Sequence, residues 1–250
     1  MRGPAKAPAI IREVLGSDMM NRVSESGAEP GKEYFFEDAG DLLLNVAGEQ
    51  RIIEERVAAC LQEDKIPLLL GGDHSVTYPI LKAVSAHHGP VNILHIDAHP
   101  DLYQDYEGNA FSHASPFARI MEDGLAEHLV QVGIRTLNSH QRQQAERFGV
   151  EILPMRGFSL EQIPSLHGPT YISIDLDGLD PAYAPGVSHH EPGGLSVRQV
   201  LDILQQVKAP VVGADIVEYN PDRDIHKMTA AVAVKLIKEL SAMAAEPREW

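Results

Sequence analysis

Short, continuously apolar runs recur along this chain, and stretches with helical periodicity separate them. Runs that are apolar at nearly every position are typical of strands buried on both faces of a parallel sheet. Strand–helix–strand repetition needs right-handed crossovers, which place helices on both faces of one sheet. The candidate strands are IPLLLGG (66–72), VNILHIDA (91–98), HLVQVGI (128–134), TYISIDLD (170–177) and PVVGADIVE (210–218).

The pattern predicts an α/β fold with three α-β-α layers, in which helices flank a single open, mostly parallel sheet. A closed barrel of eight βα units is the alternative, but the five or six clear strands are unevenly spaced and favour the open sheet. No internal repeat or low-complexity linker divides the 250 residues, so we expect one domain, 1–250. Residues 24–41 are expected to form a surface loop that leads to a short strand. The predicted helices are 49–64, 75–88, 114–124, 139–149, 196–207 and 228–246, with Ser75 and Ser196 as candidate N-caps.

The charge of the chain limits the partners that it can bind. The formal net charge is −15, from 36 acidic against 21 basic residues. Such a surface repels phosphate backbones and attracts cations, which argues against nucleic acid as a partner. No run approaches the ~18 apolar residues of a membrane span. Cys60 is the one cysteine, which we interpret as a buried small side chain in a reducing, cytosolic setting.

Acidic and histidine side chains follow four of the candidate strands. In an open parallel sheet, ligands bind at the carboxyl ends of the strands, so these side chains are expected to converge on one cleft. Taken singly, members such as Asp73 and Asp180 are as consistent with helix caps or turns. The clusters are GGDHS with His74, HIDAHPDL with Asp97, His99 and Asp101, SIDLD with Asp175 and Asp177, and ADIVE with Asp215 and Glu218.

Convergence of this many carboxylates is costly without counter-charges, because buried charges need partners. No basic residue lies within these segments. A pair of divalent cations would neutralise them, and carboxylate oxygen with imidazole nitrogen suits Mn²⁺, Mg²⁺, Fe²⁺ or Zn²⁺. In Asp97-x-His99-x-Asp101 and in Asp175-x-Asp177, alternate residues share one face of an extended segment. The sequence therefore predicts a metal site.

At these residues the chain resembles the ureohydrolase family of arginases, agmatinases and their relatives. The stretches that carry the resemblance span nearly the whole chain, and some are closest in pattern to plant-type arginases: GGDHS, HIDAHPDL, YEGNAFSHASPFARIME, SIDLDGLDPAYAPGVSHHEPGGLS and VEYNPDRD. The resemblance implies two Mn²⁺ ions per subunit. It implies that His74, Asp97, Asp101 and Asp175 hold one ion, and that Asp97, His99, Asp175 and Asp177 hold the other.

The resemblance also implies the chemistry. A guanidinium carbon is a poor electrophile, and two metals lower the pKa of a bridging water so that hydroxide attacks it. Asp101 is placed to accept the proton of that hydroxide. His113 matches the histidine that delivers a proton to the leaving amine; the alternative is a helix-start histidine without a role. Glu218 matches the acid that binds the substrate guanidinium through two parallel N–H bonds.

The substrate stays open between agmatine and arginine. Asn109, in the loop 105–110, is a candidate contact for the far end of the substrate, and His189 is either a second contact or part of a turn. No basic residue near these loops is placed to bind an α-carboxylate, a slight argument for agmatine. The acidic side chains that could meet its distal amine are Asp105, Glu107 and Glu191. The runners-up are a guanidinobutyrate or formimino-compound hydrolase and a non-catalytic metal-binding homologue.

Two further expectations follow from the resemblance. Family members are typically trimers or hexamers, so we expect a homo-oligomer. They also have a strand before the segment that matches RGPAKAPAIIREVL, with which this chain begins. Either the start of the sequence was assigned downstream, or the domain lacks the family's usual first strand; in both cases the candidate metal ligands are unaffected.

Overall fold

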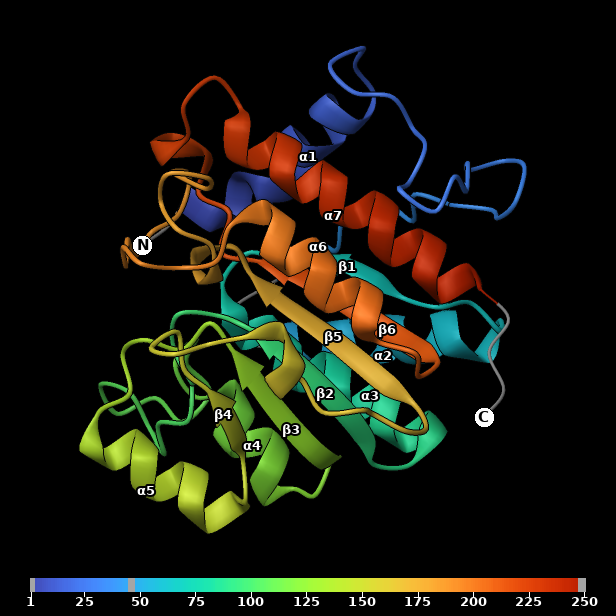
Figure 1. The fold of residues 1–250 in the computed structure, drawn as a ribbon. Coiled ribbons are helices and arrows are strands. Elements are labelled where there is room, and N and C mark those ends of the chain that lie inside the picture. The colour runs from blue at the N-terminus through green and yellow to red at the C-terminus, as the bar shows by residue number, and fades with distance from the viewer. Residues whose placement is uncertain (1–2, 45–47, 247–250) are drawn as a thin grey trace.

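Six parallel strands form one open sheet, seen in a computed structural model that describes residues 3–44 and 48–246 (Figure 1). The strand order is β1-β6-β5-β2-β3-β4. The open sheet predicted from the sequence is confirmed. The strands are β1 (Leu68–Leu70), β2 (Val91–Ile96), β3 (Ala126–Val132), β4 (Glu151–Leu153), β5 (Thr170–Asp175) and β6 (Val211–Val217).

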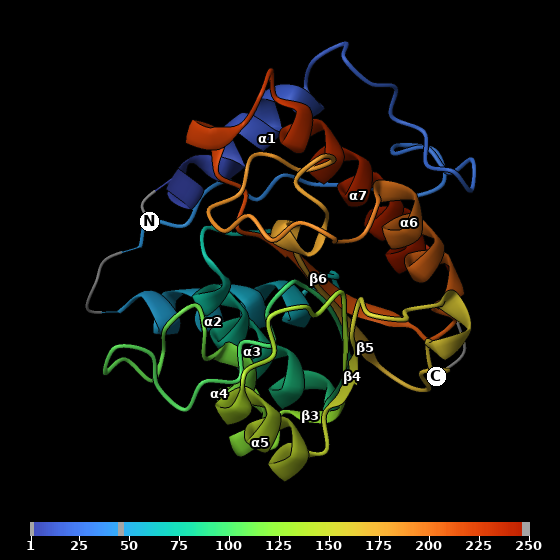
Figure 2. The same cartoon turned by 60° about the vertical axis from the view of Figure 1, so that its left-hand side comes forward.

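Helices cover both faces of the sheet, as the turned view shows (Figure 2). One face carries α1 (Ala7–Leu15), α6 (Val197–Gln206) and α7 (Met228–Ala245); the other carries α2 (Glu49–Gln62), α3 (Thr77–His88), α4 (Pro116–Glu122) and α5 (Ser139–Phe148). Five short 3₁₀ turns complete the described elements: η1 (Gly3–Lys6), η2 (His74–Val76), η3 (Leu160–Gln162), η4 (Leu176–Gly178) and η5 (Pro221–Arg223). None of the described helices is long and apolar enough to cross a membrane.

The continuous apolar runs are explained by two cores, one on each face of the sheet. Along β2, Leu94 and Ile96 pack into the core under α1, α6 and α7. Val91 and Ile93 point the other way and pack into the core under α2 to α5. Successive side chains of a strand point to opposite faces, so a strand with two buried faces must be apolar at nearly every position.

Two details differ from the sequence-based expectations. The three-residue strand β4 at the edge of the sheet was not predicted; its first residue, Glu151, is exposed, so the stretch has no continuous apolar signal. Of the short strand expected after residue 41, residues 42–44 are in irregular structure and residues 45–47 lie outside the described part. Ser196 caps α6 as predicted, whereas Asp73 rather than Ser75 caps the 3₁₀ turn before α3.

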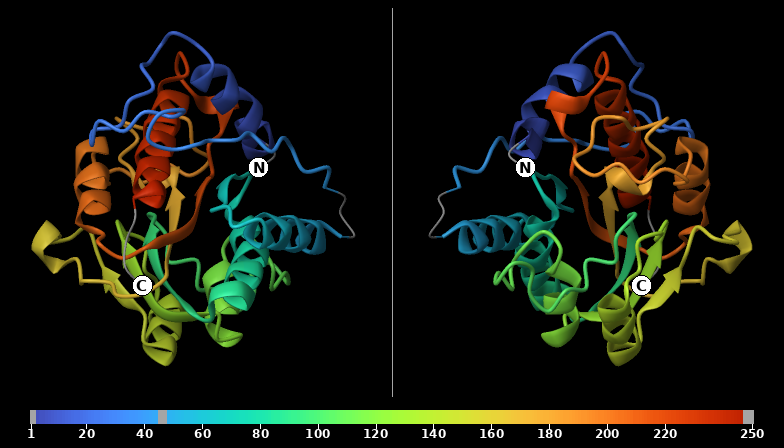
Figure 3. Two further views of the ribbon diagram at one scale, coloured as in Figure 1. Left: turned by 90° about the vertical axis from the view of Figure 1, so that its right-hand side faces the viewer. Right: turned by 90° about the vertical axis from the view of Figure 1, so that its left-hand side faces the viewer.

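β1 lies at the opposite edge of the sheet and pairs with β6 alone among the described strands. A groove of about 1310 Å³ lies beside this edge, lined by α1, α2, α7 and the segment 34–44. Figure 3 shows the N-terminal segment and α2 at this side of the molecule. None of the six candidate metal ligands lines the groove, although Asp73 and Ser75, the neighbours of His74 in the chain, do.

Candidate metal centre and active site

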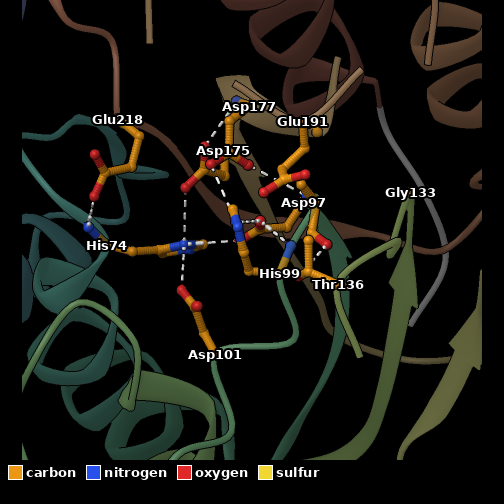
Figure 4. Close-up of polar contacts among 12 residues, drawn as sticks. His74, Asp97, His99, Asp101, Gly133, Thr136, Asp175, Asp177, Glu191 and Glu218 are labelled. Atoms are coloured by element: carbon orange, nitrogen blue, oxygen red, sulfur yellow. Dashed lines mark hydrogen bonds and ion pairs between the residues drawn. The ribbon is translucent and has the colours of Figure 1, made fainter. Parts of the chain in front are cut away.

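The sheet order brings the predicted ligands together at one edge. His74 follows β1 in η2, Asp97 follows β2, and Asp175 ends β5. In the order β1-β6-β5-β2, β5 and β2 are neighbours, and β6 alone separates β5 from β1. Their carboxyl ends therefore meet, and Figure 4 shows the side chains of His74, Asp97 and Asp175 pointing toward one another.

The six side chains form two groups that share Asp97 (Figure 4). In the first, His74 Nδ1 lies 3.2 Å from Asp97 Oδ2, 3.1 Å from Asp101 Oδ2 and 3.3 Å from Asp175 Oδ2. In the second, His99 Nδ1 lies 3.4 Å from Asp97 Oδ1 and 3.2 Å from Asp177 Oδ2. The two oxygens of Asp97 thus face different groups, which is the arrangement needed of a carboxylate that serves two cations.

The donor set fits divalent cations. His74 Nδ1 is a fully buried nitrogen without a hydrogen-bond partner among the described residues, although three carboxylate oxygens surround it. Buried polar atoms are normally satisfied, so an unpartnered nitrogen among carboxylates indicates that a further positive group belongs there. Imidazole nitrogen and carboxylate oxygen are the ligands expected for Mn²⁺ and similar ions.

The carboxyl groups are buried and repel one another. Burial and the charges of Asp177 and Asp97 raise the pKa of Asp175 well above its ordinary value. Burial and the charge of Asp97 raise the pKa of Asp101 to about 7, and burial raises the pKa of Glu218 to about 8. Raised carboxyl pKa values mean that the cluster takes up protons in the absence of metal. Cations would take the place of these protons.

A buried chain of hydrogen bonds sets the orientation of His74. Asp215 accepts hydrogen bonds from the hydroxyls of Ser173 (2.6 Å), Tyr171 (2.8 Å) and Thr77 (2.8 Å). Because Ser173 donates its proton to Asp215, its oxygen accepts from His74 Nε2 at 3.0 Å. Nε2 therefore carries a proton, and Nδ1 is the ring nitrogen that faces the carboxylates; with a cation bound, Nδ1 would be the ligand atom. A hydrogen bond to one ring nitrogen fixes the other as the ligand atom.

We expect Asp215→Asn to weaken metal binding about 10- to 100-fold, the usual cost of losing a group that orients a ligand. The amide offers one acceptor oxygen instead of two, so the three hydroxyl donors can no longer all be satisfied. The measurement is the dissociation constant for Mn²⁺ by titration calorimetry. Asp202→Asn, on the surface of α6, is the matched control. Unchanged affinity in Asp215→Asn would contradict the orienting role.

His95, which shares the alternation of the ligand residues, has a different part. Its Nε2 lies 2.8 Å from Asp97 Oδ2, and the side-chain amide of Gln131 donates to its Nδ1 at 3.0 Å. Burial lowers the pKa of His95 to about 4, so the ring is neutral and Nε2–H donates to Asp97. His95 also stacks on Phe117 with ring centroids 3.9 Å apart. It holds Asp97 in place, as expected for a histidine behind a ligand carboxylate.

The predicted catalytic and substrate residues lie around this centre to different degrees. Glu218 is buried, and its Oε1 accepts from the backbone N–H of His74 at 3.1 Å. The rings of His99, His189 and His113 form a row, with centroids 5.9 Å and then 6.0 Å apart. Asn109 is exposed, and its side-chain oxygen accepts from the N–H of Phe111 at 3.0 Å. The hydrogen bonds of Asn109 with Tyr106 and Phe111 thus stay within its own loop.

Backbone conformation also distinguishes two of these residues. Asp101 has φ of 51° and Glu218 has φ of 63°, both in the left-handed region that side chains other than glycine rarely adopt. Strained residues of this kind cluster at functional sites, where the surrounding structure enforces them. Here the backbone N–H of Glu218 donates to Gly72 at 2.9 Å, which ties the end of β6 to the loop that carries His74.

Some acidic residues of the strand ends serve the fold instead. Asp73 accepts from Ser75 as the cap of η2. Asp180 accepts from the backbone N–H groups of Ala182, Gly193 and Gly194, which closes a turn. Asp215 lies within β6 and supports His74 rather than facing the cleft, so its predicted place in the cleft was wrong. Asp215 precedes the last residue of β6 by two positions, so its side chain lies within the sheet and not at the strand end.

One basic residue near the cluster was missed by the sequence reasoning. Arg135 follows β3, three residues past its last residue, and its guanidinium reaches the turn that holds Asp177. The four acidic segments themselves contain no basic residue, so attention to those segments alone could not find it. The signal was its position after the apolar run 128–134, at the same edge of the sheet as the ligands.

Comparison with known proteins agrees with this geometry. The family model described as Arginase family matches residues 1–242. The chain belongs to the arginase family. Arginase 1, mitochondrial, of Arabidopsis thaliana is 50% identical over 97% of this chain and 76% of the plant protein. The solved arginase of Medicago truncatula superposes with a TM-score of 0.91 at 44% identity, over 98% of this chain and 82% of that one.

Membership of the arginase family confirms the resemblance seen in the sequence. It makes the chain a hydrolase of guanidino compounds, of the binuclear-metal class that acts on amidino groups. The family includes other activities: the guanidino acid hydrolase of Homo sapiens is 37% identical over 95% of this chain and 72% of the human protein. The family therefore establishes the reaction class.

The expected cytosolic location is corrected by the same comparison. The Arabidopsis relative and the arginase 1 of rice, 48% identical, are both named as mitochondrial. The expectation rested on a single free cysteine. A lone thiol indicates only that no internal disulfide forms, and it does not distinguish the cytosol from the interior of an organelle.

Proposed function

We propose that this protein hydrolyses L-arginine, with Mn²⁺ as its metal, to release urea. The observation that carries the proposal is the pair of imidazole–carboxylate groups that share Asp97 around the unpartnered Nδ1 of His74. The similarity of 44–50% to plant arginases supports arginine as the substrate. From the family resemblance, we also expect the protein to be a homo-oligomer of three or six chains.

The proposed metal ligands are the six side chains of the two groups. His74, Asp97, Asp101 and Asp175 would hold one ion, and Asp97, His99, Asp175 and Asp177 would hold the other. A pair of divalent cations supplies hydroxide near neutral pH, which a guanidinium carbon requires. Oxygen-rich sites with imidazole are suited to Mn²⁺. The remaining steps depend on side chains of this chain.

Glu218 is proposed to bind the guanidinium group. Its carboxylate is buried beside the metal ligands, and one oxygen already accepts from the N–H of His74. A carboxylate that accepts two parallel N–H bonds matches a planar guanidinium. Burial raises the pKa of the free Glu218 to about 8, so a cationic substrate would draw the group into its charged form. Binding would thereby orient the guanidinium carbon toward the ligand cluster.

Asp101 and His113 are proposed to move the protons. Asp101 is buried at the cluster, with Oδ2 3.1 Å from His74 Nδ1, and burial raises its pKa to about 7. A carboxyl group of this kind can accept a proton near neutral pH. His113 lies at the outer end of the ring row through His189. Burial lowers its pKa, so the imidazolium releases its proton readily to the leaving amine.

We expect His113→Ala to lower kcat about 10²- to 10⁴-fold, the range for loss of a proton donor, while both metal ions stay bound. The ring contacts of His113 in the described part of the chain are with Tyr106 and His189, and neither of these is a proposed ligand. Turnover and metal content by mass spectrometry are measured on the same preparation. His128→Ala, on an exposed position of β3, is the control. Loss of metal in His113→Ala would contradict the assigned role.

The far end of the substrate distinguishes arginine from agmatine. Asn109 uses its side-chain oxygen for Phe111, which leaves its amide N–H groups as donors suited to an α-carboxylate. His189, exposed and next to His113 in the ring row, is the second proposed contact. Agmatine is the second candidate, because Asp105 and Glu107 are exposed in the same loop and would attract a distal amine.

The test is urea release by the Mn²⁺-loaded protein from arginine, agmatine, guanidinobutyrate and guanidine. We expect kcat/KM for arginine to exceed that for agmatine by at least about tenfold, the effect of one good polar contact of about 1.4 kcal/mol. Asn109→Ala should raise KM for arginine alone and thereby lower the ratio of kcat/KM for arginine to kcat/KM for agmatine. A kcat/KM for agmatine higher than that for arginine would identify agmatine as the substrate instead of arginine. Activity on none of the four, with two ions bound, would overturn the proposal.

A further inference from the structure

Arg135 gives its guanidinium entirely to the backbone. Its Nε donates to a carbonyl at 2.7 Å, Nη1 to two at 3.0 and 3.2 Å, and Nη2 to two at 2.7 and 3.2 Å. An arginine has five N–H donors, and here five backbone carbonyls accept from it. The accepting carbonyls belong to Glu191, Gly133, Gly178, Asp177 and Leu179.

The five carbonyls come from three segments that meet at the active site. Gly133 follows β3, residues 177–179 form the turn after β5, and Glu191 lies in residues 188–194, here called the His189 loop. Figure 4 shows Gly133, Asp177 and Glu191 around the cluster. The guanidinium therefore joins the turn of a proposed metal ligand to the loop of a proposed substrate contact.

The turn has contacts on its other side as well. The Asp177 carboxylate lies 3.2 Å from His99 Nδ1 and accepts from the N–H of Ala98 at 3.2 Å. The N–H of Asp177 donates to Asp175 at 2.8 Å. Its carbonyl is the one that Arg135 Nη2 contacts at 2.7 Å. The peptide of Asp177 is thus held from both ends, and a change at its carbonyl moves the carboxylate that faces His99.

Glycine at two positions makes room for this arrangement. A Cβ at Gly194 would lie 2.7 Å from Arg135 Nη2, and a Cβ at Gly133 would lie 2.8 Å from the carbonyl oxygen of Asp97. Both separations are too short for any side chain. Gly133 also has φ of 98°, which residues with a side chain rarely adopt. The backbone is built to admit the guanidinium at close range.

We propose that Arg135 is a positioning residue that sets the Asp175–Asp177 turn for metal binding and couples it to the His189 loop. This inference rests on the proposed metal centre. The partners of Arg135 are carbonyl dipoles rather than carboxylates, so the residue fixes geometry at five points without removing a charge from the ligand set. Its positive charge also lies among the buried acids, which lowers the repulsion between them.

Lysine could not replace this function. Its ammonium is a compact group with three donors on a flexible stem, whereas the guanidinium is a rigid planar fork with five. The five carbonyls of three segments need donors that point in several directions in one plane. Arg135→Lys therefore keeps the charge and loses most of the geometry, which separates the electrostatic from the positioning contribution.

The experiment compares Arg135→Met and Arg135→Lys with the native protein, with Arg142→Met on the exposed face of α5 as control. We expect the weaker-bound Mn²⁺ to dissociate about 10- to 100-fold more readily in Arg135→Met, as for other groups that orient ligands. On a logarithmic scale, the Mn²⁺ affinity of Arg135→Lys should regain less than half of what Arg135→Met loses. The absorption spectrum of the Co²⁺-loaded protein should change in both variants. KM should rise in both, because the His189 loop loses an anchor.

A purely structural role predicts a different result. The melting temperature of the metal-free variants would fall, while Mn²⁺ affinity, the Co²⁺ spectrum and KM stayed native, and this outcome would overturn the inference. If Arg135→Met does not fold, the same comparison is made with Arg135→Lys. Asp177→Asn is measured in parallel. Native metal binding in Asp177→Asn would refute the metal centre itself. Weakened metal binding in Asp177→Asn together with native metal binding in the Arg135 variants would refute only the role of Arg135.

Discussion

Asp97→Asn is expected to reduce urea release by about three orders of magnitude or more, because hydroxide generation depends on both cations. Oδ2 of Asp97 lies beside His74 Nδ1 and also accepts from His95 Nε2 at 2.8 Å. Oδ1 lies beside His99 Nδ1 and accepts from the N–H of His99 at 2.6 Å. An amide replaces one of these oxygens by an NH₂ group. In either orientation of the amide, its NH₂ group faces an N–H donor of His95 or His99, and one cation site loses an oxygen ligand.

The measurement is kcat with excess Mn²⁺, together with metal content after gel filtration. We expect fewer than two ions per chain in Asp97→Asn, and native content in Asp105→Asn, which changes an exposed aspartate of the nearby loop. Circular dichroism should show the native helix and strand content in both variants. The bridging role of this carboxylate would be contradicted if Asp97→Asn bound two ions tightly and kept more than about a tenth of native activity. A tenfold loss of rate corresponds to about 1.4 kcal/mol.

Removal of metal is expected to lower the melting temperature by about 8–16 °C. An ion present at about a thousand times its dissociation constant stabilises the folded state by about 4 kcal/mol, and a chain of this size shifts by about 2–4 °C per kcal/mol. The physical source is the cluster itself. Asp175 and Asp177 have pKa values raised by burial and by the charge of Asp97, so the metal-free site holds repelling charges or takes up protons at a cost.

Differential scanning calorimetry with and without a chelator measures this effect. The difference should grow with the logarithm of free Mn²⁺ concentration, since the ion binds the folded state. The control is Asp97→Asn, whose melting temperature should depend much less on Mn²⁺. A melting temperature that is the same with and without chelator in the native protein would mean that the cluster is stable without cations, and the proposed centre would be wrong.

Most of the fold could be predicted from the sequence because the strands with the clearest apolar patterns are also the longest. Strands β2, β5 and β6 have six or seven buried residues each, and both faces of the sheet leave the same apolar pattern. β4 was missed because it has three residues and its first is exposed. Edge strands bury less, so their composition resembles that of loops.

The candidate site could be predicted in its composition but not in its arrangement. All six proposed ligands were identifiable from spacing and from the family resemblance, and the structure brings them together. Asp215 has the same residue type and a similar place in its segment, yet it lies two residues deeper and supports Ser173. Arg135 comes from a segment without acidic residues. Both depend on which strands are neighbours, and strand order cannot be read from periodicity.

The order of the strands has a consequence for how the protein folds. β1 pairs with β6 and β2 pairs with β5, so the proposed ligands meet only after long stretches of chain have been closed into loops. Topologies dominated by such distant pairings fold slowly. A cation that needs His74, Asp97 and Asp175 together has no binding site in the early, locally ordered chain. Mn²⁺ should therefore leave the refolding rate almost unchanged and act by slowing unfolding.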